Sequence, residues 1–427
     1  MALGGGTFQT QNKVLPGSYI NFISVAKANA NLSDRGYVAV PLILDYGNSG
    51  EIIEVEKEDF IKNSVKLFGY DYTHEKLKPI REIFLNAKKL YTYCLNENGT
   101  RASNIYAESK KQGIRGNDFK INIGKSVDKL GYYIVSLLLD NKVINTQEVK
   151  EASELVDDDY VVYKKDSVLT ETAGTPLEGG SNGTVNSGNH QKFLNLLENY
   201  SFNILGCPTD EKLIKSLYNE YTKRMRDEVG AKFQLVVYNY AADYEGTINI
   251  KNNIELVYWI SGLLAGCLVN KSTLNTKYTG EYEVDTKYTQ TELIKSIENG
   301  EYVLHKVGDD IRVLEDINSL ITTTKEKGEV FKSNQTIRVI DQIATDIAKI
   351  FNTKYLGIIP NNESGRIGLW ADIVKHHEQL QDIGAIENFK DSDVIVTSGE
   401  TKKAVVVSDY ITVVNAMSKL YMTVRVG

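Results

Sequence analysis

The last residues of the chain alternate apolar and polar side chains. The apolar positions are Leu420, Met422, Val424 and Val426, and the positions between them are Tyr421, Thr423 and Arg425. A period of two predicts a β-strand with one apolar face, here over residues 419–427. No turn or helix follows it, so the strand either completes the sheet of its own domain or adds to the sheet of a neighbouring molecule.

The first ninety or so residues begin with a polar, glycine-rich segment and continue with mixed helix and strand patterns. Residues 1–15 have no core pattern, which predicts an arm that is flexible when alone. The apolar and aromatic runs that follow predict helices at 57–67 and 74–87 and strands at 19–23, 37–44 and 89–95.

The pattern changes between residues 96 and 172, where short strand-like runs are separated by Gly, Asn and Asp clusters. The predicted strands are 104–107, 119–123, 132–139 and 161–163. Short strands between turn residues are typical of a small all-β unit. Residues 172–188, rich in Gly, Ser and Asn, then predict a hinge.

From residue 189 to 270, helix and strand patterns alternate. The predicted helices are 191–200, 210–228 and 253–269, the predicted strands 202–206 and 233–238, with one more strand at 302–307. This alternation predicts a parallel sheet with helices packed on it.

Beyond about residue 330 the pattern is that of a compact α+β unit. An apolar stripe predicts a helix at 335–353, and a second helix follows at 364–382. A hairpin of strands 393–397 and 404–408 precedes the terminal strand.

Composition excludes several classes of protein. The 427 residues suffice for two to four domains, and a net charge of −7 argues against a general nucleic-acid binder. The three cysteines, Cys94, Cys207 and Cys267, are too few and too far apart for a disulfide framework or a metal site. The longest apolar run, 256–269, is too short to span a bilayer, and the first residues lack a signal-peptide pattern.

Two motifs resemble catalytic or nucleotide-binding loops, and both fail in context. Residues 179–183 match G-x-S-x-G around Ser181, but no strand precedes the serine and no helix is expected before about residue 190. A hinge loop is the better interpretation. Residues 124–126 match the end of a P-loop, but Phe119 occupies the position where that motif needs glycine.

Two polar clusters could suggest metal ligands. His376 and His377 are adjacent on a predicted helix with no histidine four residues away, which favours a surface pair over a metal site. The acidic run 157–159 lacks the ligand spacing of a calcium loop and predicts a solvated turn.

Four segments carry a resemblance to a known family. Residues 112–118, followed by a strand, resemble the PG-x-RGN loop of contractile-tail sheath proteins, and residues 177–183 resemble their L-x-GG-x-DG motif with Asn182 for the aspartate. Residues 258–266 resemble their AGLLAG helix, and residues 314–320 their I-N-T-L segment. The likeness covers nearly the whole chain in order. It is strongest to sheaths of myophages, defective prophages and phage-tail-like bacteriocins from Gram-positive bacteria.

The resemblance implies an α/β multidomain fold. Its parts are a subtilisin-like α/β core without a triad, an inserted all-β sandwich, an α+β C-terminal domain, and extended N- and C-terminal strand arms. On this chain they would be an N-terminal arm at 1–20, a core at 21–90 plus 174–330, a sandwich at 91–173, a C-terminal domain at 331–416 and a C-terminal arm at 417–427.

The function that the resemblance implies is structural, with no enzyme activity, cofactor or metal. Subunits would polymerise as stacked hexameric rings around a tail tube and contract to drive the tube through a bacterial envelope. Expected partners are further copies of the chain, a tail tube protein, and baseplate and tail terminator proteins, with no nucleic acid and no membrane insertion. The particle, a phage tail or tail-like assembly, would form in the bacterial cytoplasm and be released by lysis.

The resemblance also assigns roles to residues. Those expected to join neighbouring subunits through the arms are Tyr19, Ile20, Phe22, Leu420, Met422, Val424 and Val426. The hairpin at 393–408 would receive an arm. Arg366 and Lys375 on the predicted helix 364–382 are candidates for contact with an acidic tube surface, and the alternative is an ordinary solvated helix face.

Strand donation needs the apolar face as well as the backbone. A six-residue strand gains roughly 0.5–1.5 kcal/mol net for each hydrogen bond, while ordering it costs about 1–2 kcal/mol per residue. The buried side chains must therefore supply the difference, at about 1.5–3 kcal/mol each. The alternatives to a sheath subunit are a serine hydrolase that uses Ser181 and a non-polymerising adhesin or binding module.

Overall fold

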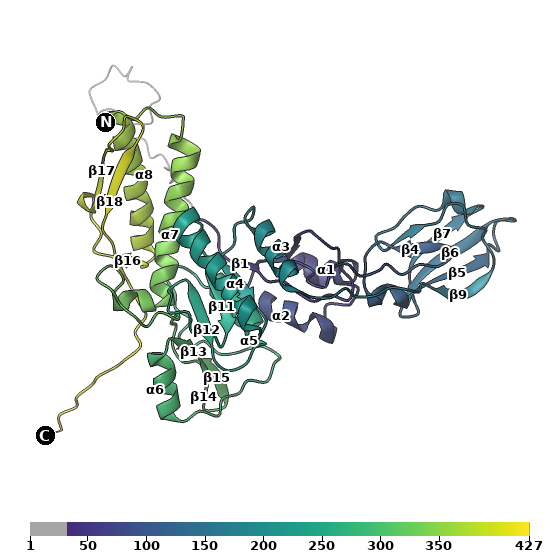
Figure 1. Cartoon of the computed structure of the whole chain (residues 1–427), viewed down its shortest axis with the longest axis horizontal. Helices are drawn as coiled ribbons and strands as arrows, with labels where there is room; N and C mark the ends of the chain where they lie inside the picture. The colour runs from purple at the N-terminus through teal and green to yellow at the C-terminus, as the bar shows by residue number, and fades with distance from the viewer. Residues whose placement is uncertain (1–31, 427) are drawn as a thin grey trace, which may run out of the picture.

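The computed structural model describes residues 32–426 of the chain. Figure 1 shows an all-β unit at one end, a pair of long helices with a hairpin at the other, and a large sheet between them. The predicted arm at 1–20 and strand at 19–23, with Tyr19, Ile20 and Phe22, lie outside the described residues. No helix in the described range has the length and apolar content to cross a membrane.

A mixed sheet forms the centre of the described chain, with strand order β13-β12-β11-β10-β1-β3-β2. Its strands are β1 (Tyr37–Ala39), β2 (Ile53–Glu56), β3 (Lys89–Thr92), β10 (Ile204–Cys207), β11 (Gln234–Tyr238), β12 (Thr247–Ile250) and β13 (Glu301–Tyr302). Neighbours run parallel except β2, which is antiparallel to β3. The parallel arrangement predicted from the alternating helices and strands is confirmed.

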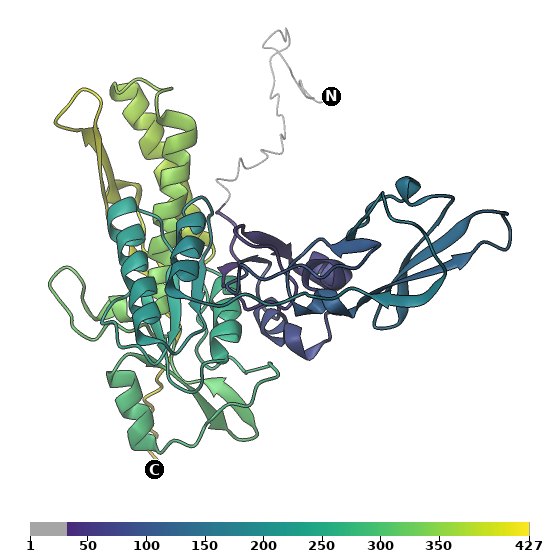
Figure 2. The same ribbon diagram turned by 45° about the vertical axis from the view of Figure 1, so that its right-hand side comes forward.

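Helices cover both faces of this sheet, which explains why its strands are apolar at successive positions. The helices are α1 (Lys57–Phe68), α2 (Lys78–Phe84), α3 (Ser187–Leu197), α4 (Lys212–Lys223) and α5 (Leu256–Gly266). Val38 packs with α1, α2 and α5, while its neighbour Ala39 packs with α3 and α4 on the other face. Figure 2 shows these helices around the sheet.

Helix α5 lies unusually close to α2 because it carries glycine at the contact. A side chain at Gly262 would collide with the carbonyl oxygen of Ile83, and one at Gly266 with that of Asn86. The predicted buried helix at 253–269 therefore owes its position to these glycines as well as to its apolar residues.

The all-β unit contains an antiparallel sheet of order β7-β6-β5-β9 and a separate ladder of β4 with β8. Its strands are β4 (Ala107–Ser109), β5 (Phe119–Lys125), β6 (Tyr133–Leu139), β7 (Lys142–Val149), β8 (Val161–Tyr163) and β9 (Thr172–Pro176). One apolar cluster fills the unit. The predicted hinge at 172–188 is wrong at its start, because Thr172–Pro176 pairs with β5 as strand β9.

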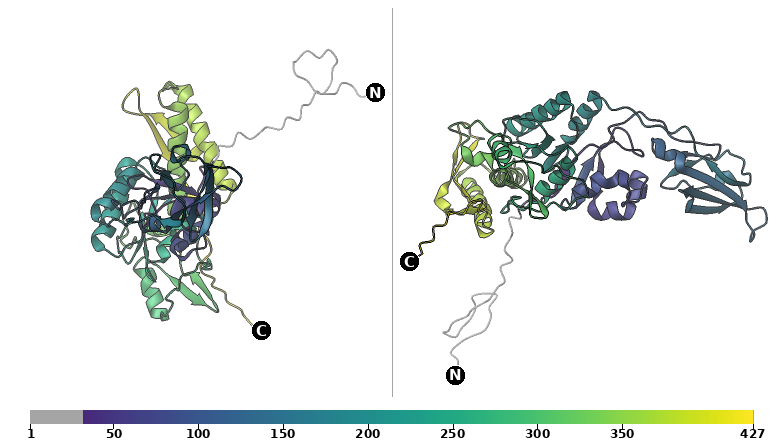
Figure 3. Two further views of the ribbon diagram at one scale, coloured as in Figure 1. Left: turned by 90° about the vertical axis from the view of Figure 1, so that its right-hand side faces the viewer. Right: turned by 90° about the horizontal axis from the view of Figure 1, so that it is seen from below.

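The C-terminal unit packs two long helices against two short antiparallel ladders, as Figure 3 shows from two further sides. Its elements are α7 (Asn334–Ile350), α8 (Glu363–Asp382), β16 (Ile386–Glu387), β17 (Val394–Ser398), β18 (Val405–Asp409) and β19 (Thr412–Val413). A π-helical turn, Phe351–Tyr355, extends α7. Along the chain between α5 and α7 come α6 (Gln290–Glu298) and the hairpin of β14 (Leu304–Val307) with β15 (Asp310–Val313).

Buried charges fix α7 to the central sheet unit. The guanidinium of Arg226 forms two hydrogen bonds with the carboxylate of Asp341, at 2.6 and 2.8 Å. Arg338 lies 3.5 Å from Asp316, with both side chains buried. Burial lowers the pKa of Arg226, but the charge of Asp341 outweighs it and holds that pKa above the usual range. These pairs make the helix and the sheet unit one packed body.

Candidate functional site

The C-terminal tail, residues 417–426, extends away from the rest of the described chain (Figure 1) and forms no strand. Its apolar side chains are largely exposed: Leu420 by 85%, Met422 by 73%, Val424 by 68% and Val426 by 91%. The alternative in which this segment completes the sheet of its own domain is therefore wrong. An apolar, strand-patterned segment is left for another surface to cover.

The residues just before the tail are held firmly against α7. The side chain of Gln335 donates to the carbonyl of Val414 at 3.0 Å and accepts from the amide of Ala416 at 2.9 Å. The amide of Val414 donates to the carbonyl of Ala385. The tail therefore leaves from a fixed point beside the N-terminus of α7.

The hairpin of β17 and β18 carries exposed apolar residues. Val394 pairs with Asp409 at one end of the ladder and Ser398 with Val405 at the other. Within residues 32–426, neither outer edge of the hairpin pairs with a further strand. Its exposed apolar side chains are Ile395, Val406, Val407 and Tyr410. An open two-stranded ladder of this kind is a ready acceptor for an added strand.

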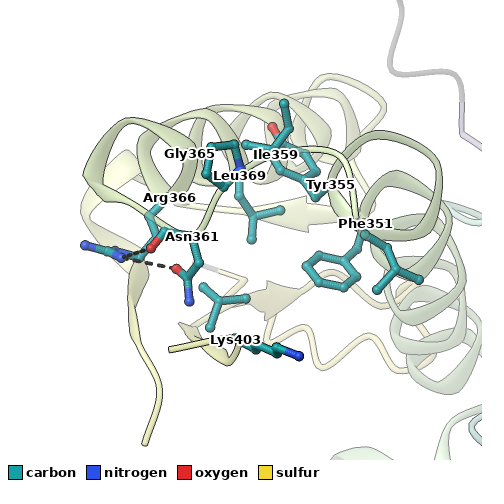
Figure 4. Close-up of a pocket in the computed structure, with 12 residues that line it drawn as sticks. Phe351, Tyr355, Ile359, Asn361, Gly365, Arg366, Leu369 and Lys403 are labelled. Atoms are coloured by element: carbon teal, nitrogen blue, oxygen red, sulfur yellow. Dashed lines mark hydrogen bonds between the residues drawn. The ribbon is translucent and has the colours of Figure 1, made fainter. Parts of the chain in front are cut away.

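A cavity of about 110 Å³ lies where the end of α7, the start of α8 and the hairpin meet. Figure 4 shows Phe351 and Tyr355 on one side of it, with Leu369 pointing into it from α8. On the opposite rim, the guanidinium of Arg366 donates to the backbone and side-chain oxygens of Asn361, at 3.3 and 3.1 Å. The cavity is thus mainly apolar with one polar edge.

The two predicted tube-contact residues do not share a face of α8. Arg366 and Lys375 are nine residues apart, which at about 100° per residue places them roughly half a turn from each other around the helix. Both are half-buried. A single flat partner surface would reach only one of them.

Ser181 lies in a loop that joins the all-β unit to the central sheet. Its backbone forms an isolated bridge with Thr100, and its hydroxyl oxygen lies 2.8 Å from that of Thr100. Several loop residues separate Ser181 from β9 on one side and from α3 on the other, so it does not lie on the sharp strand-to-helix turn of a nucleophile elbow. Within the described residues, the hydrogen bonds of Ser181 involve no histidine.

The motifs around residues 112–118 and 177–183 pack against each other, where the all-β unit joins the central sheet. Asn117 and Gly180 exchange two hydrogen bonds, at 2.8 and 2.9 Å. The side chain of Asn182 accepts from the amide of Ile114 and donates to Asp45. The two resembling motifs therefore stabilise a junction between units.

The prediction that His376 and His377 form a surface pair is wrong. Both side chains are buried, and their Nδ1 atoms lie 3.2 Å apart. The Nε2 of His376 contacts the carboxylate of Asp346 on α7, and the Nε2 of His377 that of Asp409 on β18. Asp346 and Asp409 lie 30 and 32 residues away in the sequence from the histidines that they contact. No local sequence pattern could therefore have revealed that the two histidines are buried.

Comparison with protein families gives four consecutive matches to sheath domains. Residues 35–95 match the Tail sheath protein Gp18 domain III N-terminal region, 87–182 the Phage tail sheath protein beta-sandwich domain, 183–319 the Phage tail sheath protein central domain, and 326–427 the Phage tail sheath C-terminal domain. The crystal structure of a sheath tail protein from Desulfitobacterium hafniense is 33% identical, with a TM-score of 0.83, over 95% of this chain and 99% of that one. The chain belongs to the phage tail sheath family.

Two further comparisons agree with this assignment. The Phage-like element PBSX protein XkdK of Bacillus subtilis is 29% identical over 100% of both chains. The contracted helical sheath of the anti-feeding prophage shares the fold at 13% identity, with a TM-score of 0.57 over 97% of this chain and 99% of that one. The chain is a structural subunit of a contractile tail sheath.

Proposed function

We propose that this chain polymerises as stacked hexameric rings around a tail tube and contracts to drive that tube through a bacterial envelope. The observation that carries the proposal is the C-terminal tail. It is exposed, strand-patterned and apolar on one face, and it begins at a fixed anchor. Such a segment is suited to join the sheet of a neighbouring subunit.

The energetic argument favours burial of the apolar face of the tail. Backbone pairing at about 0.5–1.5 kcal/mol per hydrogen bond at best offsets the ordering cost of about 1–2 kcal/mol per residue, and otherwise falls short of it. Full burial of Leu420, Met422, Val424 and Val426 would add about 1.5–3 kcal/mol for each side chain. Many subunits joined in this way would form a continuous mesh, because each arm acts within an already assembled array.

The N-terminal segment is the second proposed arm, over about residues 3–23. Its residues lie outside the described range. The first described residues, Leu32 and Ser33, lie beside the C-terminal unit. Leu32 packs against the apolar cluster of that unit, and the amide of Ser33 donates to Asp346 at 3.0 Å. Both proposed arms therefore leave from the same unit, which also bears the open hairpin proposed to receive an arm.

The proposed domain limits follow the sheath family. The core would comprise residues 21–90 with 174–330 and have a subtilisin-like arrangement without a triad, and residues 91–173 would form the inserted sandwich. Residues 331–416 would form the C-terminal domain, between arms at 1–20 and 417–427. The central sheet supports this division, because it combines strands from both parts of the core.

The mechanism proposed is mechanical. The extended sheath would be metastable, held by contacts with the tube and the baseplate, and contraction would lead to larger contacts between subunits. The C-terminal unit would face the tube, with either Arg366 or Lys375 in contact. We further propose that the sheath assembles in the bacterial cytoplasm and that a tail terminator protein binds one end of it. The particle would then be released by lysis.

A catalytic function for Ser181 is the main alternative. The loop geometry and the contact with Thr100 favour a structural role. A fluorophosphonate probe tests this directly, since it labels activated serines. Labelling of the wild-type chain that disappears in Ser181→Ala would overturn the non-enzymatic proposal; an unlabelled chain supports it.

Electron microscopy of the purified full-length chain tests polymerisation. A sheath subunit is expected to form rings, tubes or short sheaths as its concentration rises. A non-polymerising adhesin or binding module would remain as single particles at every concentration. Only the first result is compatible with the proposed function.

A further inference from the structure

Four buried or partly buried side chains form a continuous chain across the C-terminal unit. In order they are Asp346 on α7, His376 and His377 on α8, and Asp409 on β18. The contacts measure 3.0 Å from Asp346 to His376, 3.2 Å between the two imidazoles, and 2.7 Å from His377 to Asp409. Each contact is within hydrogen-bond distance, so each needs one proton between its two atoms.

Counting protons shows that two neutral imidazoles are not enough. A neutral imidazole carries one N–H, and each ring directs its Nε2 at a carboxylate, which can only accept when ionised. With both Nε2 atoms protonated, the two Nδ1 atoms face each other at 3.2 Å with bare lone pairs. A third proton, on a ring or on a carboxyl group, turns that repulsive contact into a hydrogen bond.

We infer that Asp346, His376, His377 and Asp409 form a buried proton-binding site, which holds one proton more than two neutral histidines do. The bound proton satisfies all three contacts. It also reduces the charge of the cluster from −2 to −1, which matters because uncompensated charge is costly in a buried environment.

The groups around Asp346 favour the ionised form of its carboxylate. Burial alone would raise the pKa of Asp346, but hydrogen bonds from His376, Ser33 and Gln342 hold it below the usual range. Arg35, on the segment that enters from the N-terminus, lies close enough for its charge to interact with that of Asp346.

The other packed elements add little charge. On α8 itself, Lys375 is half-buried and Glu378 is exposed. The loop after β16 contributes the uncharged Phe389, whose ring lies 5.1 Å from that of His377. On β18, the charged contact is Asp409 itself.

The site connects the bases of both terminal segments. Asp346 accepts the amide of Ser33, where the N-terminal segment enters, and the side chain of Gln342 bridges Asp346 to the carbonyl of Ser33. Asp409 ends β18, which leads through β19 to the C-terminal tail. If the proposed arms exist, loss of the bound proton loosens the bases of both.

The variant Asp409→Asn provides a sharp test. An asparagine amide can donate to the Nε2 of His377, whose Nδ1–H then donates to His376, so two neutral rings satisfy every contact. The side chain of Asp409 is 27% exposed, so the substitution is readily accommodated. Asp391→Asn is the matched control, since it removes an exposed carboxylate in the same unit that does not contact either imidazole.

The measurement is the unfolding equilibrium of the full chain between pH 7 and 9, below the concentration at which it assembles. Above about pH 7 unfolded histidines are mostly neutral, so the folded chain holds one more proton and loses stability as the pH rises. As the pH rises, the unfolding equilibrium constant of the wild type should increase by up to about tenfold per pH unit more than that of Asp409→Asn. The control Asp391→Asn should behave like the wild type. Equal pH dependence in all three chains would overturn the inference.

Nitrogen-15 solid-state NMR of the full chain, labelled at its five histidines, gives an independent readout that requires no variant. With carbon-13 added at the aspartate carboxyl groups, at pH 7.5 either one ring of the pair should carry protons on both nitrogens, or Asp346 or Asp409 should be protonated beside two neutral rings. Two neutral rings beside two ionised carboxylates would overturn the inference. Neither measurement depends on assembly, so failure of the proton site and failure of the proposed sheath function are distinguishable.

Discussion

The side-chain oxygen of Gln335 accepts a hydrogen bond from the backbone amide of Ala416 at 2.9 Å. This contact marks the last anchored residue before the C-terminal tail. One residue later, Met417 is 99% exposed. The boundary between the packed unit and the segment proposed to reach a neighbour is therefore a single hydrogen-bonded residue.

Replacing the anchor should loosen the base of the tail without unfolding the chain. Gln335→Leu keeps the volume of this buried side chain and removes its two hydrogen bonds, at a cost of roughly 1–3 kcal/mol in unfolding free energy. Hydrogen exchange should become faster at Ala416, whose amide loses its acceptor. Gln191→Leu, on the exposed surface of α3, is the control and should change neither quantity. Unchanged exchange at Ala416 would contradict the anchor role.

The two faces of the tail should behave differently in assembly. A triple serine substitution at Leu420, Met422 and Val424 removes the apolar face and should abolish polymers, because each buried side chain is worth about 1.5–3 kcal/mol. The matched triple serine substitution at Tyr421, Thr423 and Arg425 should leave assembly largely intact. Sedimentation measures the polymer fraction. Equal loss in both variants would show that the apolar face has no special role.

The buried pair of Arg226 and Asp341 should be costly to break from one side. Asp341→Asn leaves the guanidinium of Arg226 buried without a counter-charge, and the unfolding free energy should fall by about 3–5 kcal/mol. Denaturant unfolding measures this change. Glu58→Gln, which breaks the exposed pair with Lys62, should cost less than about 1 kcal/mol. A similarly small effect at Asp341 would mean that the pair does not hold α7 to the sheet unit.

Acid should destabilise the chain partly through His190. Burial lowers the pKa of His190 to about 4, so this residue stays neutral in the folded chain while an unfolded histidine takes up a proton below about pH 6.5. The unfolding free energy is therefore highest above pH 6.5 and should fall by up to about 2–3 kcal/mol as the pH falls toward 4. His190→Gln should flatten this part of the pH profile, and His74→Gln, at an exposed site, should not. Thermal unfolding between pH 4 and 7 measures both; a profile unchanged by His190→Gln would contradict the prediction.

Local periodicity was sufficient to predict the regular elements with strong patterns. The helix predicted at 57–67 is α1, Lys57–Phe68, and the hairpin predicted at 393–397 and 404–408 is the β17–β18 ladder. In both cases one face is apolar and the ends carry clear turn residues. Two strands with weak patterns were not predicted. β7 (Lys142–Val149) buries only one of its eight residues, and β12 (Thr247–Ile250) is only four residues long.

Among the candidate functional residues, only those that form a local sequence pattern could be predicted. The strand-like tail is visible as an alternation of residues 420–426. The burial of His376 and His377 is not visible, because it depends on Asp346 and Asp409 from other elements. The spacing of Arg366 and Lys375 was enough to show that they lie on opposite sides of the predicted helix. This argues against one contact surface that contains both residues.

Deletion of residues 418–427 tests the central claim most directly. These residues follow the anchor at Ala416, and those in the described range are exposed, so the domains should remain folded with an unchanged circular dichroism spectrum and unfolding midpoint. Negative-stain electron microscopy of the full and shortened chains at equal concentration should show rings or tubes only for the full chain. Normal tubes formed by the shortened chain would contradict the account.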